Sequence, residues 1–194
     1  MYRRQMIGQK ILCFAAIAAS AIVFLYALGL MTDLYDSLYY TMMDPSNPMD
    51  TWVQGSWIYY DMQPFNQALL RYAIALVLLS CLLFITGTHK RRRYYIGNAV
   101  STFAFCSAGV ALAAWSHTQL EMYKAQFLQV NFEELAFFSE MMDTPYIDST
   151  FWFDAHIAVY ALLLVVCALL VVNFFLKHSL MRQEARLIEE GKKV

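Results

Sequence analysis

The chain has 194 residues, of which 60% are hydrophobic and 15% are charged, and its formal net charge at pH 7 is −1. With a mean hydropathy of +0.44, this composition lies outside the range of ordinary soluble domains and inside that of multi-pass membrane proteins. It therefore predicts an all-α integral membrane protein.

Four apolar windows follow one another along the chain. Each is long enough to cross the hydrocarbon core of a bilayer, which takes about 20 helical residues. The windows are Ile11 to Thr32, Asn66 to Thr88, Tyr94 to Ser116 and Ala155 to Leu176. The first apolar run exceeds the about 7 to 15 residues of a secretory signal, so we expect it to remain as the first of four transmembrane helices.

The charged residues separate into two groups around these windows. One set of helix ends carries twelve Lys and Arg residues against three Glu residues, and includes the basic run Thr88 to Arg93. The opposite side carries twelve acidic residues against Arg71 and Lys124. Because Lys and Arg are retained in the cytoplasm during insertion, we expect a plasma-membrane protein whose two termini are cytoplasmic. Nucleic-acid binding by the basic run is conceivable, but orientation in the membrane explains it better, so no nucleic-acid partner is predicted.

The two outer segments, residues 33–65 and 117–154, contain 17 of the 31 aromatic residues. This density is incompatible with a disordered linker, and the rings must be buried against each other, the headgroups or another protein. From about Thr118 to Met141 the apolar residues keep helical spacing. This predicts an ordered extracytoplasmic cap with an outer helix, which either continues the third membrane helix or lies on the membrane surface.

The ends of the two outer segments resemble each other at a shift of 93 residues. Met49 to Asp61 reads MDTWVQGSWIYYD and Met142 to Asp154 reads MDTPYIDSTFWFD, and the register continues into the following helices without a gap. Single matches are common in such compositions, so the continuous register carries the argument for an internal repeat. We predict two tandem hairpin units at 1–88 and 94–177, a cytoplasmic basic joint at 89–93 and a cytoplasmic tail at 178–194.

Each outer segment ends with two aromatic residues and an Asp. The simpler interpretation of Asp61 and Asp154 is capping, because a carboxylate near a helix start accepts backbone N–H bonds and favours the positive end of the dipole. The alternative is a pair of aromatic platforms for a protein or a carbohydrate. The residues predicted to contact a partner or ligand at the outer face are Trp52, Trp57, Tyr59, Tyr60, Asp61, Arg71, Phe151, Trp152, Phe153 and Asp154.

Arg71 lies near the start of the second membrane helix, on a polar stripe with Gln63 and Gln67. An intramembrane charge indicates a functional site by default. An Arg this close to the surface can also extend to the headgroups or pair with an outer carboxylate, and this is the favoured interpretation.

His117 and Glu121 are four residues apart, and Asp154 and His156 enter the fourth membrane helix at similar depth. Imidazole and carboxylate groups together can bind a metal ion. The spacing matches no specific zinc or di-iron motif, so His117, Glu121 and His156 remain secondary candidates and no cofactor is predicted.

The sequence contains no catalytic motif and no polar pathway through the apolar windows. We therefore expect a non-catalytic accessory subunit of a larger membrane assembly, foremost a transporter complex, that docks a partner through its acidic, aromatic cap. Its expected partners are the lipid bilayer, other membrane subunits, and an extracytoplasmic protein or carbohydrate. The alternatives are a membrane enzyme or metal-binding protein with a His/carboxylate site at the outer face, and a carbohydrate-binding or sensor protein.

Overall fold

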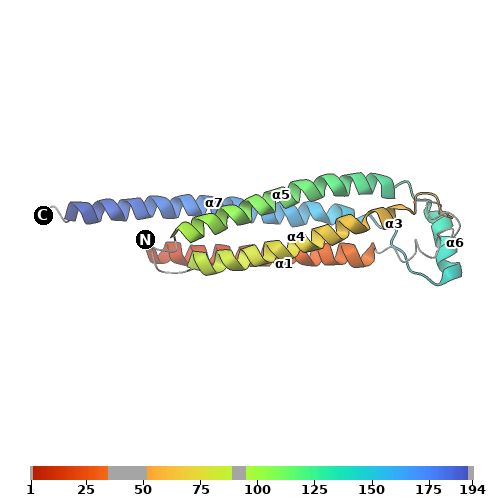
Figure 1. The fold of residues 1–194 in the computed structure, drawn as a ribbon, viewed down its shortest axis with the longest axis horizontal. Coiled ribbons are helices and arrows are strands. Elements are labelled where there is room, and N and C mark those ends of the chain that lie inside the picture. The colour runs from red at the N-terminus through yellow and green to blue at the C-terminus, as the bar shows by residue number, and fades with distance from the viewer. Residues whose placement is uncertain (1, 35–51, 89–94, 192–194) are drawn as a thin grey trace. The chain divides into compact units, whose positions relative to one another are not determined.

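The computed structural model describes residues 2–34, 52–88 and 95–191, and within these ranges it contains helices and no strand. The helices are α1 (Tyr2–Asp33), α3 (Ile58–Asp61), α4 (Gln63–Thr88), α5 (Tyr95–Phe127), α6 (Phe132–Met142) and α7 (Phe151–Gly191), labelled in Figure 1. The basic joint at 89–93 and the start of the first repeat copy lie outside the described residues.

Four helices are long and apolar enough to span a membrane, which confirms the all-α class with four such segments. They cover Gln5–Asp33, Ile58–Thr88, Tyr95–Phe127 and Phe151–Gln183, and each includes nearly all of one predicted window. The chain is helical here because an apolar surrounding requires backbone N–H and C=O groups to pair within the segment. A helix of 33 residues is about 50 Å long, against a hydrocarbon core of about 30 Å. The helix ends therefore extend into the headgroups or into water.

The predicted single outer helix at 118–141 is wrong, because two helices, α5 and α6, divide this stretch. Asn131 begins α6. Its side-chain oxygen accepts a hydrogen bond from the backbone N–H of Glu134 at 3.3 Å, and its own N–H donates to the carbonyl of Gln54 at 3.1 Å. Asn is a preferred N-cap, and a Glu three residues later is typical of a capping box. The sequence thus contains a signal for a helix start at this position, although the helical spacing of the apolar residues continues across it.

The chain forms two compact units, and all four long helices have residues in both. The terminal unit comprises Met1–Ile22, Ala75–Ala111 and Ala161–Val194. The loop unit comprises Val23–Ile74 and Leu112–Tyr160. Each is described by itself below.

In the terminal unit, polar side chains join the helices. Asn173 Nδ2 of α7 donates to Gln9 Oε1 of α1, and Lys177 Nζ of α7 donates to Asn98 Oδ1 of α5 at 3.1 Å. Gln9 and Asn98 are buried. Hydrogen bonds of this kind between apolar helices contribute about 0.6 to 2 kcal/mol each, so these pairs hold α7 against two neighbours.

In the loop unit, the indole of Trp152 fits against Gly29 of α1. A Cβ atom at position 29 would lie 2.1 Å from the Cη2 atom of this ring. Trp152 Nε1 donates to Asp33 Oδ2 at 2.7 Å, and the hydroxyl of Tyr26 donates to the carbonyl of Trp152 at 2.8 Å. One residue of α7 therefore makes three contacts with α1.

We expect Gly29→Ala to destabilise the protein, because the rigid indole must move away from the new methyl group. Overpacking costs about 1–3 kcal/mol, which exceeds the gain of about 1 kcal/mol that Ala brings to a helix interior. Gly8→Ala is the matched control in α1, since no atom lies within 4 Å of its added Cβ. Thermal unfolding in detergent, followed by tryptophan fluorescence, measures both variants. Equal midpoints for the two variants would contradict the close contact.

Candidate functional site

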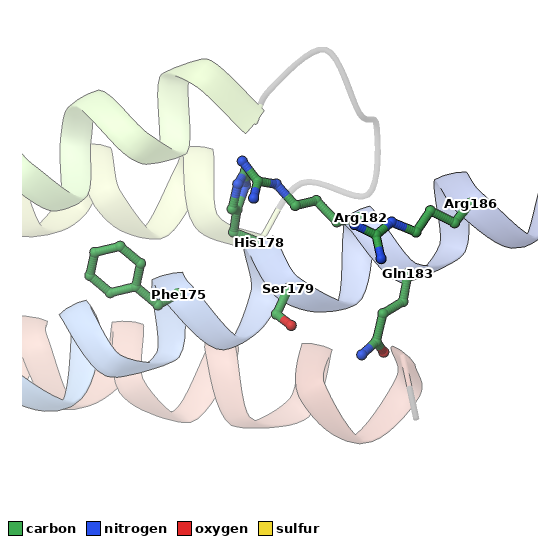
Figure 2. A pocket seen from close by; sticks show the side chains of 6 residues that line it. All are labelled: Phe175, His178, Ser179, Arg182, Gln183 and Arg186. Atoms are coloured by element: carbon green, nitrogen blue, oxygen red, sulfur yellow. The ribbon is translucent and has the colours of Figure 1, made fainter.

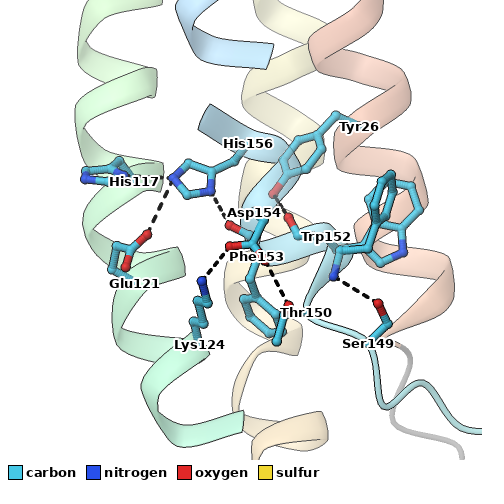
Figure 3. A network of polar contacts seen from close by, with 11 residues as sticks. Tyr26, His117, Glu121, Lys124, Ser149, Thr150, Trp152, Phe153, Asp154 and His156 are labelled. Carbon is cyan, nitrogen blue, oxygen red and sulfur yellow. Dashed lines mark hydrogen bonds and ion pairs between the residues drawn. The ribbon is translucent and has the colours of Figure 1, made fainter. Parts of the chain in front are cut away.

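Hydroxyl and carboxylate groups define the start of α7 (Figure 3). Ser149 Oγ accepts a hydrogen bond from the N–H of Phe151 at 3.2 Å. Thr150 Oγ1 donates to Asp154 Oδ2 at 2.8 Å, and Lys124 Nζ of α5 donates to Asp154 Oδ1 at 2.5 Å. The side chain that accepts a backbone N–H here is thus Ser149. Asp154, predicted as a cap or a contact residue, links α7 to α5 and also faces the positive end of the helix dipole.

Aromatic rings fill the interior of the loop unit. Phe127 and Phe153 are fully buried, with ring centroids 5.0 Å apart. The ring of Tyr59 lies 6.1 Å from that of Phe127, and its hydroxyl donates to the carbonyl of Ile147 at 2.7 Å. Tyr59 and Phe153, two of the predicted contact residues, therefore serve the interior in this structure.

Phe127→Ala is expected to lower the free energy of unfolding by about 3–5 kcal/mol, as large-to-small changes in a packed interior do. Phe137→Ala removes the same ring from α6, where it is 66% exposed, and is expected to change stability little. Thermal or denaturant unfolding in detergent compares the two. A Phe127→Ala protein as stable as the Phe137→Ala protein would contradict the packed interior.

A histidine–carboxylate cluster joins the C-terminal part of α5 to α7 (Figure 3). His117 Nδ1 lies 2.8 Å from His156 Nε2, and Glu121 Oε1 lies 4.0 Å from the same nitrogen. His156 is buried, whereas His117 and Glu121 are exposed. His156 Nδ1 is hydrogen-bonded to the carbonyl of Phe153. The structure thus brings together the three metal candidates, whereas the neighbouring Asp154 is paired with Lys124.

The other predicted contact residues lie wholly or partly at the surface. Four are exposed, namely Trp52, Tyr60, Asp61 and Phe151. Two are partly buried, namely Trp57 and Trp152. The ring of Trp57 lies 5.1 Å from that of Tyr60, and the ring of Trp52 lies 5.8 Å from that of Phe138. Aromatic pairs, rather than single rings, therefore form this part of the surface.

Arg71 is exposed on α4. Gln63 of the same polar stripe points inward instead and donates to the carbonyl of Leu34 at 2.8 Å. Asn66 is buried, and neither polar atom of its side chain has a hydrogen-bond partner among the described residues. An exposed Arg71 fits the interpretation in which its side chain extends to the headgroups.

The surface of α6 carries exposed apolar residues that the sequence analysis did not single out. Phe137 is 66% exposed and Met141, one turn later, is 55% exposed. Their spacing of four residues was the signal, since such residues share one face of a helix. Leu135 of the same helix is buried, so α6 has an inner and an outer side.

A surface hollow lies along α7 in the terminal unit (Figure 2). Its lining side chains all belong to this one helix: Phe175, His178, Ser179, Arg182, Gln183 and Arg186. The Nδ1 atom of His178 is paired with the hydroxyl of Tyr95 at 2.5 Å. Basic side chains at the end of a membrane helix suit headgroup phosphates, so the hollow has an ordinary explanation in the lipid interface.

Comparisons with protein-family models, with curated proteins and with solved structures gave no match.

Proposed function

We propose that this protein is a non-catalytic subunit of a larger membrane assembly, foremost a transporter complex, and that its loop unit docks a partner protein outside the cytoplasm. The observation that carries the proposal is the outer side of α6. There, large apolar side chains are exposed on a helix that contains acidic residues and no basic one.

The exposed apolar residues of α6 are not explained by a membrane span. Phe132–Met142 lies between two membrane-spanning helices and outside both spans. Lipid hydrocarbon accounts for exposed apolar side chains on the spans, whereas Phe137 and Met141 lie outside the spans. Apolar patches in water usually mark interaction sites, and aromatic anchors contribute most of the binding energy at interfaces.

The charges of α6 favour a protein over a lipid surface. The helix reads FEELAFFSEMM, with Glu133, Glu134 and Glu140 and no Lys or Arg. Anionic headgroups attract basic segments and repel acidic ones. The matching surface is a protein face with an apolar pocket and a basic rim.

The distribution of charge supports the arrangement as two tandem hairpins at 1–88 and 94–177. The terminal unit contains twelve basic and three acidic residues, and the loop unit contains twelve acidic and two basic residues. Under the positive-inside rule, both chain ends and the basic joint at 89–93 face the cytoplasm of a plasma-membrane protein. The outer segments 33–65 and 117–154 then form the extracytoplasmic cap.

Polar contacts in the terminal unit support a structural role. Asn173 bonds to Gln9, Lys177 to Asn98, and the hydroxyls of Thr86 and Ser101 lie 2.6 Å apart. These groups bind one another between helices, as interhelical hydrogen bonds do in bundles. Because these polar groups are paired with one another, they favour a structural subunit over a protein that transports a substrate by itself.

A carbohydrate platform built on Trp52, Trp57, Tyr59, Tyr60 and Trp152 is less favoured. Tyr59 is buried and hydrogen-bonded through its hydroxyl. Trp152 covers Gly29. Two of the five rings are thus committed to internal contacts.

The membrane orientation can be tested with Glu140→Cys and Gln183→Cys. On intact cells, a membrane-impermeant maleimide is expected to label Glu140→Cys and to leave Gln183→Cys unlabelled until the cells are opened. The four native cysteines lie inside the spans, whereas Gln183 is the last residue of its span, so the background labelling is expected to be low. The reverse labelling pattern would contradict the proposed orientation.

Docking can be tested with Phe137→Ala and Met141→Ala in affinity purification from native membranes, with partners quantified by mass spectrometry. Loss of one anchor of about 2 kcal/mol weakens binding roughly thirtyfold. Phe175→Ala is the matched control, because Phe175 is 59% exposed and has a neighbouring Phe174 ring at 5.7 Å, as Phe137 has Phe138 at 5.6 Å.

Support requires a partner that wild-type and Phe175→Ala proteins recover and the α6 variants lose. Equal recovery by all four proteins would refute docking through α6.

A further inference from the structure

We infer that His117, Glu121 and His156 form a binding site for one divalent transition-metal ion, which joins α5 to the start of α7. The inference goes beyond the proposed docking role, and it uses none of the residues of α6.

The three side chains converge from two helices. His117 and Glu121 are one turn apart on α5, and His156 reaches them from α7 (Figure 3). One ligand atom from each residue lies within 4.8 Å of the other two. A pair of imidazoles with one carboxylate is a ligand set found in zinc and non-haem iron sites.

His156 is held in the orientation of a metal ligand. Its side chain is 1% exposed, and Nδ1 donates to the carbonyl of Phe153. Because a carbonyl only accepts, the neutral ring carries its proton on Nδ1 and directs the lone pair of Nε2 toward His117. A second ring nitrogen bonded to a backbone carbonyl is the usual support of metal-binding histidines. The ring of Tyr160, with its centroid 6.2 Å away, adds an apolar wall.

The distances suit a metal ion after a small movement. Two nitrogen ligands about 2.0–2.1 Å from a tetrahedral zinc ion are about 3.3 Å apart, against 2.8 Å between His117 Nδ1 and His156 Nε2. Glu121 Oε1, at 4.0 Å from His156 Nε2, must approach by a similar amount. Both moving side chains are exposed, which gives them room to rotate. His117 then carries its proton on Nε2 and coordinates through Nδ1.

The surroundings select the class of ion. Imidazole nitrogens favour zinc, iron, copper and nickel, whereas magnesium and calcium prefer oxygen ligands. Lys124, the nearest cation on the same helix, is paired with Asp154 at 2.5 Å, which reduces its repulsion of the ion. Three protein ligands on an exposed side leave positions for water or for another molecule.

Metal binding can be measured on the full chain in detergent, stripped with a chelator and titrated with zinc chloride by calorimetry, with magnesium chloride as the comparison ion. We expect about one zinc ion per chain and no comparable magnesium binding. His117→Ala and Glu121→Gln are expected to weaken zinc binding by at least about tenfold to a hundredfold, since loss even of a supporting residue has that effect. Both residues are exposed, so these variants should fold.

His178→Ala is the matched control. It removes a histidine of α7 that lies in the terminal unit and contacts Tyr95, and it is expected to keep wild-type zinc affinity. Absence of stoichiometric zinc, or wild-type zinc affinity in the His117→Ala and Glu121→Gln proteins, would overturn the site. Partner recovery by the α6 variants is a separate measurement, so either proposal can fail alone.

Discussion

Side chains at the start of α7 project in several directions, because successive residues of an α-helix are rotated by about 100°. Trp152 contacts α1, Phe153 enters the aromatic interior, and Asp154 and His156 reach two different residues of α5. The packing of the loop unit depends on this short stretch, since each of these side chains contacts a different neighbour.

The two contacts with α5 differ in environment. Lys124 and Asp154 form an exposed pair, and such pairs add little stability in water. His156 is buried beside His117. The exposed pair therefore helps to position α7 against α5. Both nitrogens of the buried imidazole must keep a partner, because an unpaired buried polar group is costly.

Capping at both ends explains how α6 can present a fixed surface. The helix is capped by Asn131 at its start and by Asp143, in the left-handed conformation, at its end. The hydroxyl of Ser139 donates to the carbonyl of Thr144 at 2.5 Å, which closes the turn after the helix. A helix fixed at both ends loses less conformational entropy when a partner binds it.

Much of the fold was predictable from the sequence, because hydrocarbon imposes a length and a composition on each spanning helix. The end of the second spanning helix at Thr88 agrees in prediction and structure. The break before Asn131 was missed, because apolar spacing continues across it through Leu128, Val130 and Leu135, and spacing alone does not register a cap.

The candidate site was predictable in part. The i, i+4 pair of His117 and Glu121 is local, so spacing alone places both on one side of a helix. The choice of His156 over Asp154 depends on how α7 is rotated against α5, which is a tertiary property. Likewise, no local pattern shows that Tyr59 turns inward while Tyr60 is exposed.

The contact between Gly29 and Trp152 has a consequence for how this protein can evolve. The indole occupies the space that a side chain at position 29 would need. A larger residue in α1 is therefore acceptable only with a smaller one in α7, and contacting positions of this kind co-vary. The indole also donates to Asp33 and lies with its ring centroid 6.0 Å from that of Tyr26, so its substitution would release constraints on those two positions as well. Positions 26, 29, 33 and 152 are therefore expected to co-vary as one group.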